Sequence, residues 1–419
     1  MYKYFLALGS NIGKIDKNID NAIKQLKNIG CKIINIAPFY HTKPLLPPNA
    51  DESYNKIFCN TVVEVETNFE PFEMLRKIKQ IETEMGRNPN HALWSPRIID
   101  IDIPYCEKQG LPVIIATAEL TIPHKELFNR AFVLDPLSHI APNLSINGKN
   151  ILTESKKQVL HQSAIMAIVN VNNNSFSGDG SIDANINENK IHSLVQQRVA
   201  FIDIGAESTN PKSLPISANE ELSRLQIANI FNIIKKYKTN GVRFSIDTYH
   251  PETAEFCIKN GFDVINDVNG FKNTRMWKIM QKNTKIEAVV MHSIVPNGDK
   301  KNVLPEHVNI IDMLNEWVID VEKKAQENNI DKNRIIIDYG IGFGKTAKQD
   351  LFIINNIDKI DNRGFRVLIG HSMKSFMTIL GAQTNTERQD MTNKISSLLT
   401  KKGVDVLRLH RLIINTTSL

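Results

Sequence analysis

Residues 164–171 read Ala-Ile-Met-Ala-Ile-Val-Asn-Val, an apolar run that only Asn170 interrupts. Strands that are buried on both faces, as in an all-parallel sheet, have this composition. Seven further short apolar runs follow, with helical stretches between them, at 200–204, 243–246, 262–266, 286–291, 334–337, 365–369 and 404–408. Eight such strands alternating with helices within about 255 residues predict an α/β TIM (β/α)8 barrel, and the alternative is an open doubly wound sheet.

The ends of these eight runs carry polar residues. In chain order they are Asn170, Asp203, Asp247, Asn266, His292, Asp338, Lys374 and Arg408. Because the carboxyl ends of barrel strands meet at one face, where the active sites of such barrels lie, we expect these side chains to converge. A single residue of this kind, such as Asn266, is more often a strand-end cap. The series of eight therefore indicates a site.

The first part of the chain has another pattern. Apolar runs and helical periodicities alternate in the order βαββαβ, at 2–8, 19–26, 32–37, 57–66, 70–85 and 98–103. This order predicts an α+β ferredoxin-like sandwich. Between 140 and 163 the chain becomes polar and lacks a long regular pattern. We therefore expect a domain of residues 1–160 and a second domain of residues 161–419, and the length of 419 residues also suggests two cores.

Composition narrows the functional class. The net charge of +6 comes from 51 basic and 45 acidic residues without a long basic run, so anionic small substrates explain it as well as nucleic acid does. The four cysteines form no CxxC pair, which disfavours a zinc site and a disulfide framework. No signal peptide and no apolar run of about 18 residues is visible. We expect a cytoplasmic protein without nucleic-acid or membrane partners.

Asp100 and Asp102 stand two residues apart in the apolar and acidic stretch that ends the first pattern. On a strand both carboxylates project from one face. Mg²⁺ bound to nucleotide phosphates prefers one or two carboxylates, and Arg87 and Arg97 can balance the transferred charge. Taken alone, the pair is as consistent with solvated acids on an edge strand. No Walker motif is present in this domain, so ATP would be bound without a P-loop.

Three motifs of this domain are Leu8-Gly9-Ser10-Asn11, Phe39-Tyr40-His41-Thr42, and Trp94-Ser95-Pro96-Arg97 running into the aspartates. Together they resemble hydroxymethyldihydropterin pyrophosphokinase over residues 1–145. The resemblance implies that Asp100 and Asp102 bind two Mg²⁺ ions between ATP and the pterin hydroxymethyl group. It implies ATP contacts from Arg87, Arg97, His124 and Arg130, and pterin contacts from Thr42, Phe58, Asn60 and Phe132. Pro89 departs from the family pattern, where a second arginine of a mobile loop is frequent.

The barrel carries motifs at nearly every strand end. They are Ile165 to Val171 with Ser175-Phe176-Ser177, Asp203 to Thr209, Ser245 to Thr248, Ile265 to Asp267, Asp338 to Lys345, Gly370 to Ser375 and Arg408-Leu409-His410. They resemble dihydropteroate synthase over roughly residues 164–415. The resemblance implies that the pterin is bound by Asp247, Asn266, Asp338 and Lys374, and the diphosphate by Asn170, Arg408 and His410, with Mg²⁺ near Asn170. Thr209 and Phe343 are further substrate-binding candidates, and Lys374, Arg408 and His410 are the catalytic candidates. The resemblance also leaves room for a homodimer through the barrel.

Three departures from this family pattern cluster on the side that receives p-aminobenzoate and closes over the diphosphate. Asn172-Asn173-Asn174 replaces Thr-Pro-Asp, and Asn210 and Met373 each replace an arginine. Arginine is a planar, bidentate anion donor that Asn and Met cannot replace. Our interpretation is a bifunctional folate-synthesis enzyme that acts on hydroxymethyldihydropterin, ATP and p-aminobenzoate. One alternative is an active pyrophosphokinase fused to a catalytically impaired pterin-binding barrel. Another is a different pterin-dependent barrel, such as a methyltransferase domain, which the short chain disfavours.

Overall fold

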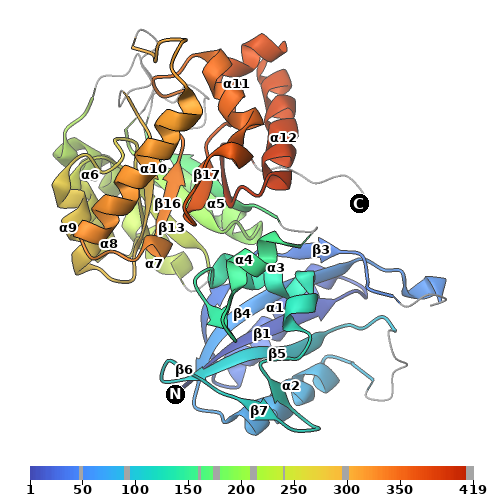
Figure 1. Ribbon diagram of the computed structural model, residues 1–419. Helices are drawn as coiled ribbons and strands as arrows, with labels where there is room; N and C mark the ends of the chain where they lie inside the picture. The colour runs from blue at the N-terminus through green and yellow to red at the C-terminus, as the bar shows by residue number, and fades with distance from the viewer. Residues whose placement is uncertain are drawn as a thin grey trace. The chain divides into compact units, whose positions relative to one another are not determined.

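The computed structural model describes residues 1–46, 51–88, 95–158, 162–172, 180–207, 215–238, 241–294 and 302–411. The chain forms two compact units, the first made mainly of Met1–His161 and the second of Gln162–Lys238 and Val242–Asn415 (Figure 1). Each unit encloses its own hydrophobic core. No helix in the described part of the chain has the length and apolar character that a membrane crossing needs.

The N-terminal unit is built on an antiparallel sheet in the spatial order β2-β4-β1-β5-β6. Its strands are β1 (Tyr2–Ser10), β2 (Lys32–Ile36), β3 (Tyr40–Thr42), which pairs with β4, β4 (Phe58–Thr67), β5 (Asp100–Lys108) and β6 (Leu111–Pro112). Helix α1 (Ile15–Asn28) follows β1, and α2 (Pro71–Glu84) connects β4 to β5. With β1 and β4 at the centre, this is the predicted ferredoxin-like arrangement.

Helices cover both faces of this sheet. Alternate residues of β1 point to opposite faces, so Tyr4 and Leu6 pack with α1 and α2, whereas Phe5 lies in a second cluster with Leu134 and Leu137 of α3. The remaining elements are η1 (Glu52–Tyr54), β7 (Ile115–Ala116), β8 (Thr121–Ile122), η2 (Leu127–Asn129), α3 (Ala131–Ile140), β9 (Ser145–Ile146), β10 (Lys149–Asn150) and α4 (Ile151–Lys156). Helix α3 was not predicted, because it contains Pro136 and its largely apolar sequence has no clear 3.6-residue period.

The C-terminal unit is a closed barrel of parallel strands, which excludes the open-sheet alternative. Each predicted run overlaps one of its strands, which are β11 (Ala164–Asn170), β12 (Phe201–Gly205), β13 (Arg243–Asp247), β14 (Val264–Asp267), β15 (Glu287–Met291), β16 (Ile335–Asp338), β17 (Arg366–Ile369) and β18 (Val406–Leu409). The helices of this unit are α5 (Ala184–Gln196), α6 (Ala218–Ile227), α7 (Ile230–Tyr237), α8 (Pro251–Lys259), α9 (Thr274–Lys282), α10 (Ile310–Glu327), α11 (Ala347–Asn355) and α12 (Asn385–Lys401), with short turns η4 (Lys332–Arg334), η5 (Ile357–Lys359) and η6 (Ser375–Leu380).

The interior of the barrel changes from apolar to polar toward the carboxyl ends of the strands. Strands of a barrel alternate inward and outward residues, and alternate strands supply one layer of side chains. The lower layers form one apolar cluster that includes Phe201, Val264, Ile336 and Val406. Two residues further along the same strands stand Asp203, Asn266, Asp338 and Arg408. This polar layer is therefore the floor of the site at the carboxyl face.

Candidate functional sites

In the N-terminal unit, Gly9 separates two predicted site residues. It pairs with Asn60 of β4 on one side and with Asp100 of β5 on the other. Residues paired across strands share a face of the sheet, so the amide and the carboxylate lie on the same face. A Cβ atom at Gly9 would come within 3.0 Å of Asn60 Oδ1. The missing side chain therefore leaves room between the two groups.

Asp100 is held by the two arginines that were predicted to contact the phosphates, Arg87 and Arg97. Arg87 Nη1 lies 2.5 Å from Asp100 Oδ1, and Arg97 Nη1 lies 2.7 Å from Oδ2. Burial alone would raise the pKa of Asp100, but Arg97 and Arg87 outweigh it and hold the pKa below its ordinary value. The carboxylate is therefore ionised. Glu82, which the sequence did not single out, also contacts Arg87 at 2.6 Å and accepts the Ile101 N–H at 2.7 Å.

Asp102 lies on the same face of β5 as Asp100, while Ile101 and Ile103 face the core. Arg130 Nη1 lies 3.1 Å from Asp102 Oδ2. Nearby, His124 Nδ1 accepts the Glu126 N–H at 3.1 Å, and burial lowers the pKa of His124, so its ring is neutral at pH 7. The structure thus places two of the four predicted ATP-contacting residues, Arg130 and His124, near the second carboxylate.

The predicted pterin residues lie on the same face. Asn60 Nδ2 donates to Thr42 Oγ1 at 3.1 Å, and the guanidinium carbon of Arg97 lies 5.9 Å from the ring centre of Phe58. Phe132 packs against the cluster that covers this face. Pro89 and Trp94 lie outside the described residues.

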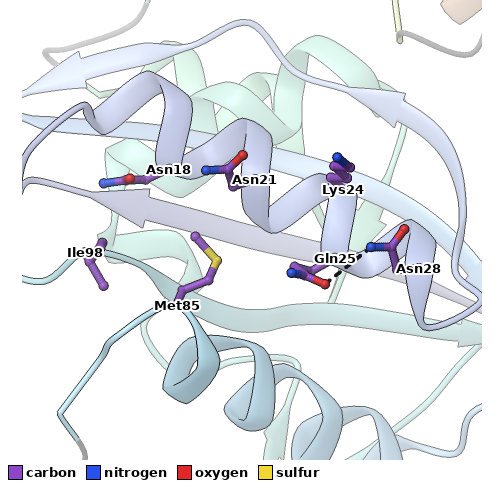
Figure 2. Close-up of a pocket in the computed structure, with 7 residues that line it drawn as sticks. All are labelled: Asn18, Asn21, Lys24, Gln25, Asn28, Met85 and Ile98. Atoms are coloured by element: carbon purple, nitrogen blue, oxygen red, sulfur yellow. Dashed lines mark hydrogen bonds between the residues drawn. The ribbon is translucent and has the colours of Figure 1, made fainter.

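A separate cavity of about 330 Å³ lies beside α1, away from these residues. Figure 2 shows the side chains that line it, Asn18, Asn21, Lys24, Gln25 and Asn28 of α1 together with Met85 and Ile98. None of the predicted site residues lines this cavity.

In the barrel, hydrogen bonds to Asp203 connect three strands, β12, β14 and β18. Asp203 Oδ2 accepts hydrogen bonds from Arg408 Nε at 2.7 Å and from Asn266 Nδ2 at 2.9 Å. Arg408 Nη2 also donates to Asp247 Oδ2 at 2.5 Å. Strands β12, β14 and β18 are not neighbours, so these contacts cross the barrel interior. Asp203 is fully buried, and its Oδ1 accepts no hydrogen bond from any described residue.

Asp203 is a site residue for which sequence reasoning predicted a place at a strand end but no contact. The sequence marked it as one of eight polar strand ends, and the family resemblance assigned it no contact. Its full burial is the property that sets it apart, and burial of a charged group requires a partner or a ligand. The strand-end series and the motif from Asp203 to Thr209 were therefore the signals that pointed to it.

The charges of this layer shift one another's pKa values. Burial raises the pKa of Asp247 to about 7, while Arg408 opposes the shift and Asp203 adds to it. Burial lowers the pKa of Lys374 to about 8, against the pull of Asp338. Burial also raises the pKa of Asp338, whose Oδ1 accepts the Gly340 N–H at 2.8 Å. Groups that change protonation near neutral pH are typical of functional sites.

Two of the predicted diphosphate residues stand beyond this layer, because Asn170 pairs with Gly205, two residues after Asp203, and His410 follows Arg408 by two residues. The third, Arg408, belongs to the layer itself. Burial and the charge of Arg408 lower the pKa of His410 to about 3, so its ring is neutral, and its backbone N–H donates to Ser372 Oγ at 3.2 Å. Asn170 ends β11 opposite Gly205, and within the described part of the chain no hydrogen bond joins its side chain to Arg408 or His410. Phe343 faces Lys374, whose Nζ lies 4.7 Å from the ring centre.

Thr209, Asn210, Asn173, Asn174 and the Ser175–Ser177 motif lie outside the described residues. Of the three departures from the family pattern, the structure describes Met373 and the first residue of the Asn172-Asn173-Asn174 stretch. Met373 has a φ of 59°, the left-handed region that a methionine rarely adopts, and its N–H donates to Thr392 Oγ1 at 3.1 Å. Asn172 is buried.

Comparisons with known proteins match both units. Residues 166–410 match the family described as pterin binding enzyme, and residues 5–142 match 7,8-dihydro-6-hydroxymethylpterin-pyrophosphokinase. The chain is 28% identical to the folic acid synthesis protein fol1 of Schizosaccharomyces pombe, covering 97% of this chain and 57% of that protein. It is 29% identical to the folate synthesis bifunctional protein of Chlamydia trachomatis, covering 97% of this chain and 94% of that protein.

Solved structures agree with these matches. Dihydropteroate synthase from Anaplasma phagocytophilum, with bound 6-hydroxymethylpterin-monophosphate, is 31% identical and superimposes with a TM-score of 0.54, covering 60% of this chain and 94% of that chain. An HPPK-DHPS structure in complex with substrates covers 98% of this chain and 97% of that chain at a TM-score of 0.53. Its identity of 19% supports the shared fold alone.

These findings give no support to an impaired barrel, which was the alternative interpretation. One family match lies in each unit of the structure. The relatives named folate synthesis bifunctional protein align with 97% of this chain. The chain therefore belongs to the pterin binding enzyme family through its barrel, and an HPPK domain precedes that barrel as in the bifunctional proteins of folate synthesis.

Proposed function

We propose that the chain catalyses two consecutive reactions of folate synthesis. The N-terminal unit transfers the diphosphate of ATP to the hydroxymethyl group of 6-hydroxymethyl-7,8-dihydropterin and releases AMP. The barrel then joins the pterin diphosphate to p-aminobenzoate and gives 7,8-dihydropteroate and diphosphate. The observation that carries this proposal is the polar layer of Asp203, Asn266, Asp338 and Arg408, which supplies paired acceptors and donors at the carboxyl face of the barrel.

For the first reaction, Asp100 and Asp102 have the chemistry to hold Mg²⁺. Both present carboxylate oxygens on one strand face, and the arginines beside Asp100 keep it ionised, which fits a hard cation bound with phosphate oxygens. Mg²⁺ would neutralise charge on the transferred phosphates. Arg87 and Arg97 then orient and neutralise the same phosphates, and Asn60 and Thr42 orient the pterin on the neighbouring strands.

For the second reaction, the polar layer reads the edge of the pterin ring. The buried Asp203 Oδ1 is an acceptor for a ligand N–H, because its other oxygen already receives two donors. Asp247, Asp338 and Lys374 border the same space. A substrate that lacks one of these hydrogen-bonding groups would leave a buried partner unpaired, which costs about 1–3 kcal/mol and so rejects analogues.

The chemical step needs stabilisation of the leaving diphosphate. The p-aminobenzoate amine attacks the methylene carbon, the carbon–oxygen bond to diphosphate breaks, and the amine loses a proton. Fixed cationic and hydrogen-bond donors perform this role, and we assign it to Arg408 of the polar layer and to His410 and Asn170 beyond it. Arg408 uses Nε and Nη2 on the two aspartates, so Nη1 is the donor that we assign to the diphosphate.

The test is a coupled assay of the full chain with ATP, Mg²⁺, hydroxymethyldihydropterin and p-aminobenzoate. We expect AMP and dihydropteroate in equal amounts. AMP without dihydropteroate, although pterin diphosphate binds, would overturn the synthase half of the proposal. Removal of Mg²⁺ by EDTA should abolish AMP formation, and persistence of AMP formation would overturn the metal assignment.

The remaining assignments are also proposals. We place the domain boundary near residue 160 and the protein in the cytoplasm, because its four cysteines form no disulfide bond, as in a reducing compartment. We also predict a homodimer through the barrel. Sedimentation equilibrium of the full chain tests this prediction, because it measures the mass of the assembly in solution. A monomer across the micromolar range would contradict it.

A further inference from the structure

A tight loop joins β16 to α11 beside the predicted pterin site. We call residues 340–344 the glycine loop, because Gly340, Gly342 and Gly344 have positive φ angles of 64°, 81° and 69°. A Cβ at Gly340 would lie 1.9 Å from His292 O, and a Cβ at Gly344 would lie 2.6 Å from Ile294 Cβ. Glycine is therefore required at these two positions, and the loop lies directly against the end of β15.

The ammonium group of Lys345 is buried beneath this loop. Its Nζ lies 3.0 Å from Gly340 O, 3.2 Å from Phe343 O and 3.0 Å from His292 Nδ1. Burial, together with the charge of Lys345, lowers the pKa of His292 to about 3, so the ring is neutral and its Nδ1 is an acceptor. One cation thus holds both ends of the loop to the end of the neighbouring strand.

Acidic side chains hold the N–H groups of the same loop. Asp350 of α11 is almost fully buried, and its Oδ1 accepts the Gly342 N–H at 2.8 Å. Asp338 Oδ1 accepts the Gly340 N–H at 2.8 Å. Helix α11 is itself anchored by a capping box between Thr346 and Gln349, so Asp350 has a fixed position.

The other side of the glycine loop contacts Lys374. Lys374 Nζ donates to Ile341 O, and its ammonium faces the ring of Phe343 at 4.7 Å. A Cβ at Gly342 would lie 3.3 Å from Lys374 Cδ. The position of the loop therefore decides where the Lys374 ammonium lies.

We propose that Lys345 and Asp350 are positioning residues of the synthase site, which hold the glycine loop so that the loop places Lys374 against the pterin. Neither residue was a predicted site residue, and neither needs to touch substrate. The proposal rests on the proposed role of Lys374 in pterin binding. It accounts for two buried charged groups whose hydrogen bonds go largely to one short stretch of backbone.

The charges around Lys374 make this role separable from a purely structural one. The charged groups that face Lys374 are Asp338 of β16, Asp350 of α11, Arg408 of β18, Asp247 of β13 and Lys345, and the neutral rings of His371 and His410 lie nearby. Burial raises the pKa of Asp350 to about 6, so it is ionised above pH 7 and stabilises the charged form of Lys374. Burial lowers the pKa of Lys345 to about 8, so below that pH Lys345 is a second buried cation, and its charge disfavours the charged form of Lys374.

The two substitutions Lys345→Met and Asp350→Asn therefore have opposite electrostatic effects. Loss of the Asp350 charge lowers the pKa of Lys374, and loss of the Lys345 charge raises it. If pterin diphosphate binding requires the Lys374 ammonium, affinity falls as the pH rises through the pKa of Lys374. This fall in affinity, the alkaline limb, moves to lower pH in Asp350→Asn and to higher pH in Lys345→Met. Disordering of the loop alone would move both limbs in the same direction or leave both unchanged.

The experiment measures pterin diphosphate binding to the full chain by calorimetry from pH 6.5 to 9.5, together with dihydropteroate formation. We expect a loss of roughly 10- to 100-fold in kcat/KM for Lys345→Met and Asp350→Asn, the scale for a group displaced by about 1 Å. Lys345→Arg should restore the wild-type pH limb, because it keeps the charge. The control Lys348→Met, on the same helix but exposed, should change neither quantity more than about twofold.

The proposal would be overturned if the alkaline limbs of Asp350→Asn and Lys345→Met did not shift in opposite directions. Wild-type activity in both variants would also overturn it. If Lys345→Met does not fold, Asp350→Asn alone still tests the predicted downward shift, because it preserves shape. Failure of the proposed function would look different. A wild-type chain that binds pterin diphosphate without forming dihydropteroate contradicts the synthase reaction, whereas the binding limbs of the variants still decide the roles of Lys345 and Asp350.

Discussion

Replacement of Asp203 by asparagine should weaken both the barrel and its pterin site. The substitution keeps the shape of the side chain but replaces one carboxylate oxygen by an amide that donates. Asp203 Oδ2 receives Arg408 Nε at 2.7 Å and Asn266 Nδ2 at 2.9 Å, and an asparagine carbonyl cannot keep both bonds as a charged acceptor. One buried donor is then unpaired, or faces another donor.

The expected cost follows from this geometry. Breaking a buried ion pair by removing one partner costs about 3–5 kcal/mol, and we expect a loss of about 3 kcal/mol, because Arg408 keeps Asp247 and asparagine keeps one acceptor. Binding of pterin diphosphate should weaken by a further 1–3 kcal/mol, about 5- to 150-fold, through the lost Oδ1 contact. Removal of the negative charge should also lower the pKa of Asp247 below about 7.

The assay is urea unfolding of the full chain, followed by the fluorescence of Trp277 and Trp317, which both lie in the barrel. Calorimetric titration with pterin diphosphate measures the loss in affinity. The control is Asp320→Asn, because Asp320 pairs with Lys324 at an exposed position of α10 and should contribute at most about 0.5 kcal/mol. An Asp203→Asn variant that unfolds and binds within about 0.5 kcal/mol of the wild type would refute this account of the polar layer.

Three further predictions follow from the two units. Asp102→Ala should abolish AMP formation while the melting of the N-terminal unit stays unchanged, and near-normal pyrophosphokinase activity would contradict the metal assignment. Met373→Arg should lower the KM for p-aminobenzoate with little change in kcat, whereas Met373→Gln should leave this KM unchanged. Equal KM values in the two variants would show that the missing arginine at position 373 does not weaken p-aminobenzoate binding. Burial lowers the pKa of His371 to about 4, so its neutral form stabilises the fold above pH 6.5 and this stability is lost as the pH falls from 6.5 toward 4. Urea midpoints over this range should fall less steeply in His371→Asn than in the exposed-site control His307→Asn, and equal slopes would contradict the assignment.

Much of the fold was predictable because it is encoded locally. A barrel strand is buried on both faces, so it reads as a short apolar run, and each run from 164–171 to 404–408 overlaps an observed strand. The ferredoxin-like order follows in the same way from alternating runs and helical periods. Helix α3 escaped prediction because it contains Pro136 and is largely apolar, so it lacks the clear period that marks an amphipathic helix.

The candidate site was predictable only as a set of residues. The DxD pair and the polar strand ends named Asp100, Asp102, Asp247, Asn266 and Arg408, because spacing of two on a strand and position at a strand end are local properties. No local pattern states which of these groups are buried or which face one another. Their pKa values depend on those neighbours, and so does their chemistry.

By itself, then, the sequence determined the strands, the helices and the polar ends that a barrel gathers at one face. Only the tertiary structure decided that Asp203 accepts a hydrogen bond from Arg408, which lies 205 residues away in the sequence. The same holds for the hydrogen bonds by which Lys345 and Asp350 contact the backbone of the glycine loop. The physical reason is that a buried charge must find its partners in space, and closure of the barrel brings together strands whose separation along the chain gives no sign of the contact.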